Sequence, residues 1–511
     1  MFVRKKPNKS GTVSIQVIEK RNGSSRLMKT IGSSADASEI ESLFQQGKLW
    51  IKNYKHQYDL FEESTLPDHS EEEMVDFVVS NIENVLINGI QLITEKVFKS
   101  IGFDGLEDEI LRHLVTARLS QPMSKSGTSA YLKDYFDEDV HYQKIYRYMD
   151  KLYNTRQEAI QRISVEHTRS ILGGSIGLLF YDVTTLYFET DEADNLRERG
   201  FSKDGKHAQP QVVLGLLVSR DGYPLSYSIF NGSQYEGRTM LPIVDDFIHK
   251  YQLDDFVIVA DSGLMNKNNI RLLEASGYKY ILGGRIKNER QSIKEWILSL
   301  EKRDGALYER AIDNHRLVVG YSDKRAKKDK YNREKGVKRL EASYRTGKLT
   351  KDHVNKKGYN KFLELSNDIE VKISQEKINE DEGWDGLKGY VTNTDLPVEE
   401  VYAQYTGLWV IERAFRVTKG TIELRPMFHF TPRRIEAHVA ICFVAYKVYK
   451  ELERIIKIKG IDLSVDKVLD IAKTITTIKI KLPSQKKAIQ KTLLVTPKQQ
   501  KIASLIYEEF N

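Results

Sequence analysis

The sequence predicts a mixed α/β core with helical regions before and after it along the chain. An apolar run at residues 176–181 ends in a carboxylate, Asp182, and continues into a β-branched tail, which is typical of a buried strand. A second apolar run, at residues 256–260, ends in the same way at Asp261. Long stretches on both sides of this region place their apolar residues at helical spacing instead. We therefore expect the sheet in the middle of the chain.

Composition limits the class of protein. With 511 residues the chain is too long for one ordinary domain, and its formal net charge of +7 favours a polyanionic partner. The single cysteine, Cys442, lies in an apolar stretch and excludes an internal disulfide and a cysteine-based zinc site. We find no secretory signal and no run of about 18 apolar residues. We therefore expect a cytoplasmic protein with no membrane partner.

The first third of the chain changes character once. Residues 1–34 alternate polar and apolar positions and predict a small β unit, whereas residues 35–170 follow helical spacing. Within the helical part, tyrosines are interleaved with lysines and an arginine between residues 142 and 153. This mixture suits contact with a DNA backbone and equally suits packed tyrosines beside solvated lysines.

The central region predicts strands and helices in the order β, β, β, α, β, α, β. The second and third strands form a hairpin with Asp221 and Gly222 at its turn. The order begins as a meander and continues with crossover connections, which is the order of ribonuclease H-like cores. Asp182 then ends the apolar part of the first strand and Asp261 follows the fourth. In α/β sheets, side chains at the carboxyl ends of strands form sites.

Two further regions flank this order on its C-terminal side. Residues 287–386 contain strand-like segments around a very basic run, and their position favours an inserted, partly β domain. Residues 431–511 are helix-rich, and lysine and arginine outnumber the acidic residues there. That excess favours a surface that faces phosphate or a partner.

A helix after residue 397 offers a third acid. Tyr405, Glu412 and Lys419 recur every seven residues, so they share one helix face. Arg416 lies one turn beyond Glu412 on the same face. Taken alone, this pattern is better explained by an ordinary amphipathic helix with an Arg–Glu pair, because such pairs are common.

Asp182, Asp261 and Glu412 together suggest a catalytic metal site. Mg²⁺ prefers carboxylate and phosphate oxygens, and a pair of such ions can activate an attacking oxygen and stabilise the leaving one. We therefore expect these three acids to hold two Mg²⁺ ions, with Mn²⁺ as the alternative. Lys419 and Tyr405 would contact DNA phosphates, the lysine as a point charge and the tyrosine through its hydroxyl.

Several stretches in combination resemble the DDE transposases of bacterial insertion sequences. They are YDVTTLYFE at 181–189, the region from PQVVLGL to NGSQYEGRT at 210–239, VIVADSGL at 257–264, WDGLKGYVTNT at 384–394, and YTGLWVIERAFRVTKGTIELRP at 405–426. The closest group carries a β-rich insertion before the catalytic glutamate and a Tyr–Arg–Glu–Lys signature around it. Tyr405, Glu412 and Lys419 fall on this signature, whereas Leu408 occupies the arginine position. Arg416 is the candidate to replace that arginine.

The resemblance implies an activity and a set of partners. In such transposases the three acids bind two divalent metal ions, water cuts at the ends of the element, and the exposed 3′-hydroxyl attacks target DNA. The expected partners are the terminal inverted repeats, target DNA and a second copy of the chain in the synaptic complex. Relatives can also hold a flipped base by stacking in the inserted domain, and Trp384 is a candidate, although a core position explains this tryptophan better. The resemblance also implies a location at the bacterial nucleoid.

The resemblance also suggests a division of the chain. The N-terminal region usually reads the terminal repeats and the C-terminal region often dimerises. We expect the following parts: a small β unit at 1–34, a helical DNA-end-binding region at 35–170, the first part of a ribonuclease H-like catalytic core at 171–286, an inserted, partly β basic domain at 287–386, the second part of the core at 387–430, and a helical, basic, dimerising region at 431–511.

Alternative functions remain open at this point. A ribonuclease H-like nuclease would cut DNA without joining it, and a non-catalytic DNA-binding protein derived from a transposase would need none of the acids. A basic RNA-binding protein would explain the charge but not Asp182 and Asp261. His207, His429 and His438 have no metal-ligand spacing with cysteine, so we expect them in loops or in packing. No phosphate-binding loop motif occurs, so ATP is not implied.

Overall fold

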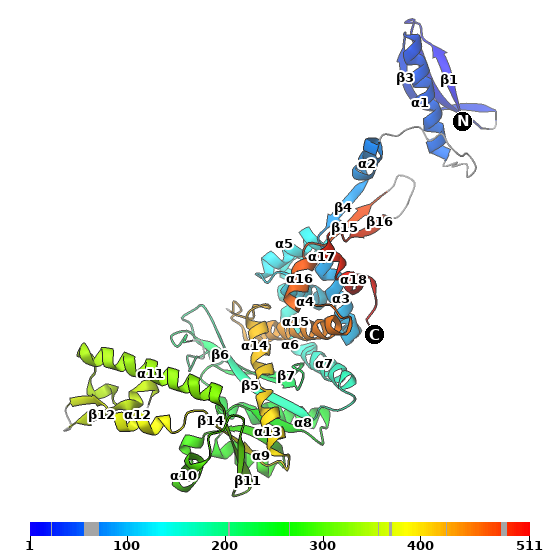
Figure 1. Ribbon diagram of the computed structural model, residues 1–511. Coiled ribbons are helices and arrows are strands. Elements are labelled where there is room, and N and C mark those ends of the chain that lie inside the picture. The colour runs from blue at the N-terminus through cyan, green and yellow to red at the C-terminus, as the bar shows by residue number, and fades with distance from the viewer. Residues whose placement is uncertain are drawn as a thin grey trace. The chain divides into compact units, whose positions relative to one another are not determined.

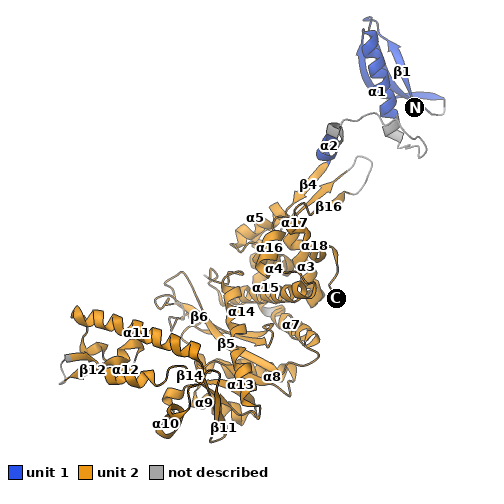
Figure 2. Ribbon diagram, viewed as in Figure 1, with its two compact units in different colours: residues 1–81 blue, residues 82–511 orange. Residues whose placement is uncertain are grey.

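A computed structural model describes residues 1–21, 23–55, 71–202, 205–264, 266–355, 357–366, 370–425, 427–481 and 488–510. The chain divides into two compact units, residues 1–81 and residues 82–511 (Figure 2). None of the helices in the described ranges is long and apolar enough to cross a membrane.

The first unit is a three-stranded antiparallel sheet with a long helix against it. The strand order is β1-β2-β3, and Ile15, Val17 and Ile18 of the central strand are buried. The β unit that the alternation predicts is thus present. The elements are β1 (Phe2–Pro7), β2 (Val13–Arg21), β3 (Ser24–Ser34), α1 (Ala37–Lys55) and α2 (Glu71–Ser80).

The second unit is organised around an eight-stranded mixed sheet. Its order is β10-β11-β14-β9-β8-β5-β6-β7, and β5, β8 and β9 run parallel to one another, whereas the other pairs are antiparallel. The mixed sheet that the sequence predicts is therefore confirmed. The strands are β5 (Leu178–Tyr187), β6 (Gln211–Ser219), β7 (Pro224–Asn231), β8 (Val257–Ala260), β9 (Lys279–Gly284), β10 (Leu307–Ile312), β11 (His315–Tyr321) and β14 (Leu387–Thr392).

Helices cover both faces of this sheet. Side chains along β5 therefore alternate between two apolar cores, one on each face. Leu179 and Tyr181 belong to the core that also contains residues of α8, α9 and α10. Phe180 and Leu186 belong to the core shared with α13, α14 and α15. Figure 1 shows the sheet and these helices. The helices are η2 (Glu236–Arg238), α8 (Met240–Tyr251), α9 (Lys267–Ala275), η3 (Ile286–Asn288), α10 (Gln291–Ser299), α13 (Val398–Thr406), α14 (Trp409–Lys419) and α15 (Pro432–Ile458).

One part of the region expected as an insertion belongs to the central sheet, and the other part lies outside it. Within residues 287–386, β10 and β11 extend the sheet, because β11 pairs antiparallel with β14. The remainder forms a small cluster of its own around Leu340 and Phe362. The very basic run is one long helix, α11. The elements are α11 (Asp323–Arg345), η4 (Lys351–His353), η5 (Gly358–Phe362), β12 (Leu363–Ser366), β13 (Glu370–Ile373) and α12 (Gln375–Glu382).

The helices that precede the sheet along the chain and those that follow it form one helical region. Its apolar residues pack with α15 and with the β5 face that carries Phe180. Its elements are α3 (Gly89–Ile101), η1 (Phe103–Leu106), α4 (Glu109–Ser120), α5 (Lys125–Phe136), α6 (Tyr142–Thr155), α7 (Gln157–Ile171), α16 (Val465–Ala472), α17 (Pro497–Gln500) and α18 (Ala503–Tyr507).

Three strands lie where helical patterns are expected. They are β4 (Ile82–Leu86), β15 (Thr476–Ile480) and β16 (Ile489–Leu493), which form a sheet of order β16-β15-β4. Val85 pairs with Ile478, almost 400 residues further along the chain. The strand conformation therefore depends on tertiary pairing, which overrides local helical propensity. The expected domain boundaries and the roles of the outer regions stay predictions.

Candidate active site

Two predicted acids lie at neighbouring positions of the central sheet. Tyr181 pairs with Ala260 in the parallel register of β5 and β8, so Asp182 and Asp261 occupy the next position on each strand. Neighbouring strands lie about 4.8 Å apart, and matching positions of parallel strands face the same side. The same level of β9 carries Gly283, because Ala260 pairs with Leu282.

These positions face the side of the sheet that α13 and α14 cover. Phe180 and Val259, two residues before each aspartate, belong to the core that contains Ile411 of α14. The helix pair approaches closely, since a Cβ at Gly407 would lie 2.8 Å from Cζ of Phe180. The two aspartates therefore lie on the face that the helices carrying Tyr405 and Glu412 cover. Figure 1 shows α14 crossing β5.

The predicted single helix is in fact two helices. α13 ends at Thr406 and α14 begins at Trp409, and the backbone amides of Leu408 and Val410 bond three residues back rather than four. The tight turn at Gly407 changes the angular relation that a seven-residue spacing would give. Tyr405 thus lies on a different helix from Glu412 and Lys419.

Tyr405 contacts the second aspartate directly. Its hydroxyl donates a hydrogen bond of 2.9 Å to Oδ1 of Asp261. Burial, followed by the charge of Asp261, raises the pKa of Tyr405 far above its usual value, so the hydroxyl stays protonated and remains a donor. The sequence placed Tyr405 against phosphate; its partner in the structure is the carboxylate.

Lys388 brings positive charge to the same place. Its ammonium group lies 4.5 Å from the ring centroid of Tyr405. Burial and the charge of Arg325 lower the pKa of Lys388, while Asp261 and Glu412 act in the opposite direction. Lys388 therefore interacts electrostatically with both acids. Glu412 thus lies near the same lysine as Asp261.

The donor set fits hard divalent cations. Asp182 is half-buried, whereas Asp261 and Glu412 are exposed, and the three carboxylates offer the oxygen ligands that Mg²⁺ prefers. Among the residues that the structure describes, no three acidic, histidine or cysteine groups stand close enough together to hold an ion. The metal-binding and catalytic roles of Asp182, Asp261 and Glu412 accordingly stay predictions.

The remaining predicted residues differ in their surroundings. Arg416 is exposed and lines a groove with Arg413, between α14, α15 and α16. Lys419 is half-buried at the end of α14. Leu408, at the position of the signature arginine, is 8% exposed and packs in the core, so a charged side chain there would be buried. The proposed DNA contacts of Tyr405, Arg416 and Lys419 stay predictions.

Two further residues belong to this site and had no role in the sequence prediction. Lys388 lies two positions before Tyr390 on β14, and Tyr390 packs in the core on the side of the aspartates. Glu236 lies near the loop after Asp261, since a Cβ at Gly263 would be 3.6 Å from its Oε2. The stretches QYEGRT and KGYVTNT were recognised as motifs, but nothing in a single sequence shows which of their residues face the site.

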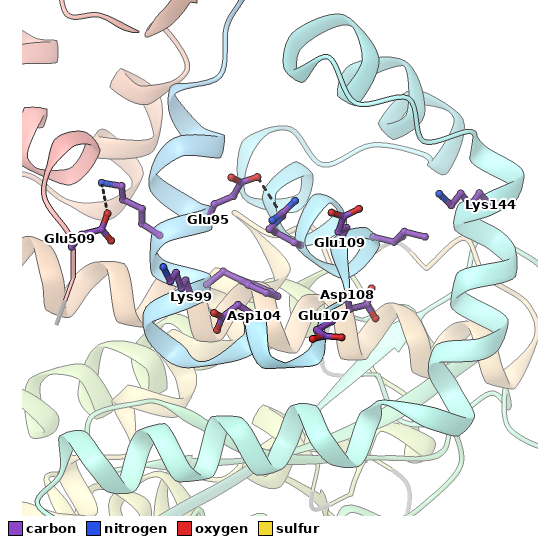
Figure 3. Close-up of a pocket in the computed structure, with 12 residues that line it drawn as sticks. Glu95, Lys99, Asp104, Glu107, Asp108, Glu109, Lys144 and Glu509 are labelled. Atoms are coloured by element: carbon purple, nitrogen blue, oxygen red, sulfur yellow. Dashed lines mark ion pairs between the residues drawn. The ribbon is translucent and has the colours of Figure 1, made fainter. Parts of the chain in front are cut away.

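A pocket outside this site is lined by acids that the fold itself uses (Figure 3). Asp108 caps α4 by accepting a hydrogen bond of 3.0 Å from the amide of Leu111, and it accepts a second one of 2.8 Å from Tyr148. Glu95 pairs with Arg112 at 3.5 Å. We therefore assign this pocket no function.

Comparison with known proteins defines the family. Residues 173–447, more than half of the chain, match the family described as the transposase DDE domain. The chain belongs to that family. The match spans all eight strands of the central sheet together with α13 and α14, so the candidate site lies inside it. No curated protein matches the sequence.

Solved structures similar to the chain include transposases bound to DNA. A piggyBac transposase synaptic complex with hairpin DNA is 10% identical, with 75% of this chain and 78% of that chain covered and a TM-score of 0.39. A Mos1 transposase paired-end complex with left transposon end is 9% identical, with 46% and 66% covered and a TM-score of 0.16. A Mos1 strand transfer complex is 11% identical, with 48% and 68% covered and a TM-score of 0.15.

Proposed function

We propose that the protein is the transposase of a bacterial insertion sequence, and that it cleaves the ends of its element and joins them to target DNA. The observation that carries this proposal is the position of Asp182 and Asp261 at matching points of two parallel strands, under the helices that carry Tyr405 and Glu412. Family membership supports the reaction class, and the neighbouring positions of the two aspartates support the choice of residues.

In this proposal the acidic and the basic residues have different roles. Asp182, Asp261 and Glu412 are the ligands for two divalent ions, which would supply the activation of the attacking oxygen and the stabilisation of the leaving one. Tyr405 holds the Asp261 carboxylate in one orientation through its hydroxyl. Lys388 and Arg325 add positive charge where a DNA phosphate would approach.

The partners follow from this reaction. The terminal inverted repeats and target DNA are the substrates, and a homodimer holds two ends together in the synaptic complex. Arg416 and Lys419 contact the DNA backbone in this proposal. The helical region and the C-terminal region are assigned to end recognition and to dimerisation, respectively.

The test compares two aspartates on opposite ends of one strand. Asp261 follows β8, whereas Asp255 precedes it and is exposed. With DNA carrying the inverted repeats that flank the gene, Asp261→Ala should lower Mg²⁺-dependent cleavage by more than about 100-fold, because an ion ligand is lost, and should leave DNA binding intact. Asp255→Ala should cleave like the wild type. Retained cleavage by Asp261→Ala would overturn the assignment.

Joining distinguishes a transposase from a nuclease. When pre-cleaved ends with free 3′-hydroxyls are incubated with a supercoiled plasmid, the wild-type protein should link them to the plasmid. Cleavage without any linked product would identify a ribonuclease H-like nuclease. Absence of both activities, together with specific binding, would identify a DNA-binding protein derived from a transposase.

A further inference from the structure

A basic cavity of about 250 Å³ lies outside the candidate active site. It is lined by α4, the start of α5, α6, the loop between α14 and α15, and α15 itself. Its lining includes Arg118, Lys125, Arg425 and His429, with Glu423 as the acid among the lining residues. The cavity thus carries an excess of positive charge.

Lys125 is the unusual residue of this cavity. It is 4% exposed, and within the described part of the chain no carboxylate pairs with it and no acceptor takes a hydrogen bond from its ammonium group. Burial, with a smaller contribution from Arg118, lowers the pKa of Lys125 to about 7. A buried cation is costly unless an anion accompanies it. The same residue begins α5, a helix of 12 residues whose N-terminus favours negative charge.

The two histidines at the cavity, His429 and His438, are uncharged. Burial, and then the charges of Lys125 and Arg118, lower the pKa of His429 to about 3, and the pKa of His438 is lowered as well. Both rings are therefore neutral at physiological pH and can donate a hydrogen bond without adding charge. The sequence prediction of packing histidines agrees with their burial.

An exposed aromatic side chain lies at the edge of the same cavity. Phe428 lines it and is 64% exposed, although a phenylalanine in a loop would ordinarily pack. The loop is fixed to the strand of Asp182, because the amide of Met427 donates a hydrogen bond of 3.2 Å to the carbonyl of Tyr187. Tyr187 lies five residues beyond Asp182, which corresponds to about 17 Å along a strand. That distance spans about five nucleotides of a DNA strand.

We propose that this cavity binds a phosphate of the DNA backbone a few nucleotides from the cleavage point, with Lys125 as its buried cation and Phe428 stacked on the neighbouring base. The inference rests on the proposed function, since it names a contact of that same DNA. Base stacking on exposed aromatic rings and pairing of phosphate with lysine are the usual contacts of DNA strands.

The main test removes the charge without leaving a void. Lys125→Met keeps an unbranched side chain that is one atom shorter, and it should fold with an equal or higher Tm because the unpaired buried cation is gone. Lys133→Met, an exposed lysine of the same helix, is the matched control. In filter binding with end DNA, Lys125→Met should weaken binding about tenfold or more and lower the salt slope by about one. Lys133→Met should do neither. Equal binding by the two variants would overturn the proposal.

DNA with a single uncharged backbone linkage identifies the phosphate that contacts Lys125. A set of end duplexes, each with one methylphosphonate, should contain a position at which the loss of charge weakens wild-type binding and has no further effect on Lys125→Met. Phe428→Ala should weaken binding with a loss that is larger for single-stranded DNA than for duplex DNA. Additive losses at every methylphosphonate position would exclude contact between Lys125 and one phosphate.

Inorganic phosphate separates this inference from the proposed function. It should raise the Tm of the wild type and leave the Tm of Lys125→Met unchanged. If phosphate stabilises the wild type while the wild type and Lys125→Met bind DNA with the same affinity, the cavity binds free phosphate and the DNA contact is refuted. If neither measurement depends on Lys125 while Asp261→Ala still abolishes cleavage, this inference fails and the proposed function stands. If phosphate stabilises the wild type and the protein neither binds nor cleaves end DNA, the proposed function fails.

Discussion

The hydroxyl of Tyr405 determines how Asp261 is presented. It is a protonated donor 2.9 Å from Oδ1, on a ring that packs against Tyr390 at a centroid distance of 4.7 Å. A carboxylate held in this way keeps its second oxygen for another ligand. Partners that orient ligating carboxylates influence both metal affinity and rate.

Removal of that hydroxyl is a test at the level of one residue. Tyr405→Phe should lower cleavage about 10–100-fold and raise the Mg²⁺ concentration needed for half-maximal activity, because Asp261 loses its orienting donor. DNA affinity should not change. Tyr402→Phe, on the same helix and partly exposed, is the control. An equal loss at saturating and limiting Mg²⁺, or a loss of DNA affinity instead of rate, would show that Tyr405 contacts phosphate, as its sequence position suggested.

Single residues also mark the limit of the sequence prediction. Asp182 and Asp261 could be found because each ends an apolar run, where an unpaired charge is costly. Lys388 could not be found, because a lysine at the second position of a strand is as common at an ordinary surface. Its relation to the site depends on the antiparallel pairing of β14 with β9. Leu408 packs in the apolar core, which explains why an apolar residue occupies the position of the signature arginine. A sequence motif does not show this packing.

At the level of elements, β9 leaves space for Tyr405. A Cβ at Gly283 would lie 2.5 Å from the hydroxyl oxygen of Tyr405 and 2.7 Å from the amide nitrogen of Ser262. These distances are shorter than packed atoms allow, so a larger side chain must displace the hydroxyl or the loop after Asp261. Glycine at this position therefore permits the helix α13 to reach the second aspartate.

Gly283→Ala should consequently reproduce the defect of Tyr405→Phe. We expect cleavage to fall about 10–100-fold, because the hydrogen bond to Asp261 is broken from the opposite side. The combination of both substitutions should lose little more than either alone, since they act on the same contact. Gly177→Ala is the matched control, because its Cβ would have no neighbour within 4 Å. Full activity of Gly283→Ala would show that the Tyr405–Asp261 bond is not required.

Elements with local signals were predicted well, and elements that depend on distant partners were not. The hairpin of β6 and β7 and the strands β5, β8 and β9 follow from alternation, apolar runs and a turn signal. In contrast, β4 pairs only with the distant β15, which itself also pairs with β16, and β10 and β11 join the central sheet through β14. The break between α13 and α14 follows from the close packing of Gly407 on Phe180, which spacing along the sequence cannot show.

At the scale of the whole chain, topology brings distant acids to one face. Asp182 and Asp261 occupy neighbouring positions because the crossover from β5 to β8 places these strands side by side and parallel. Glu412 comes from a helix that follows the inserted segment and returns over the same face. One apolar core continues from this face into the helical region and α15, so the helical region and the catalytic sheet fold as parts of one unit.

Counting bound ions tests the central claim that these three acids act as one metal site. Mn²⁺ bound to the full-length protein with end DNA can be titrated by electron paramagnetic resonance, because free and bound ions give different signals. We predict that the wild type and Asp255→Asn bind a pair of ions, and that Asp182→Asn, Asp261→Asn and Glu412→Gln each bind fewer. A variant at any of these three positions that binds as many ions as the wild type, with the same affinity, would contradict the account.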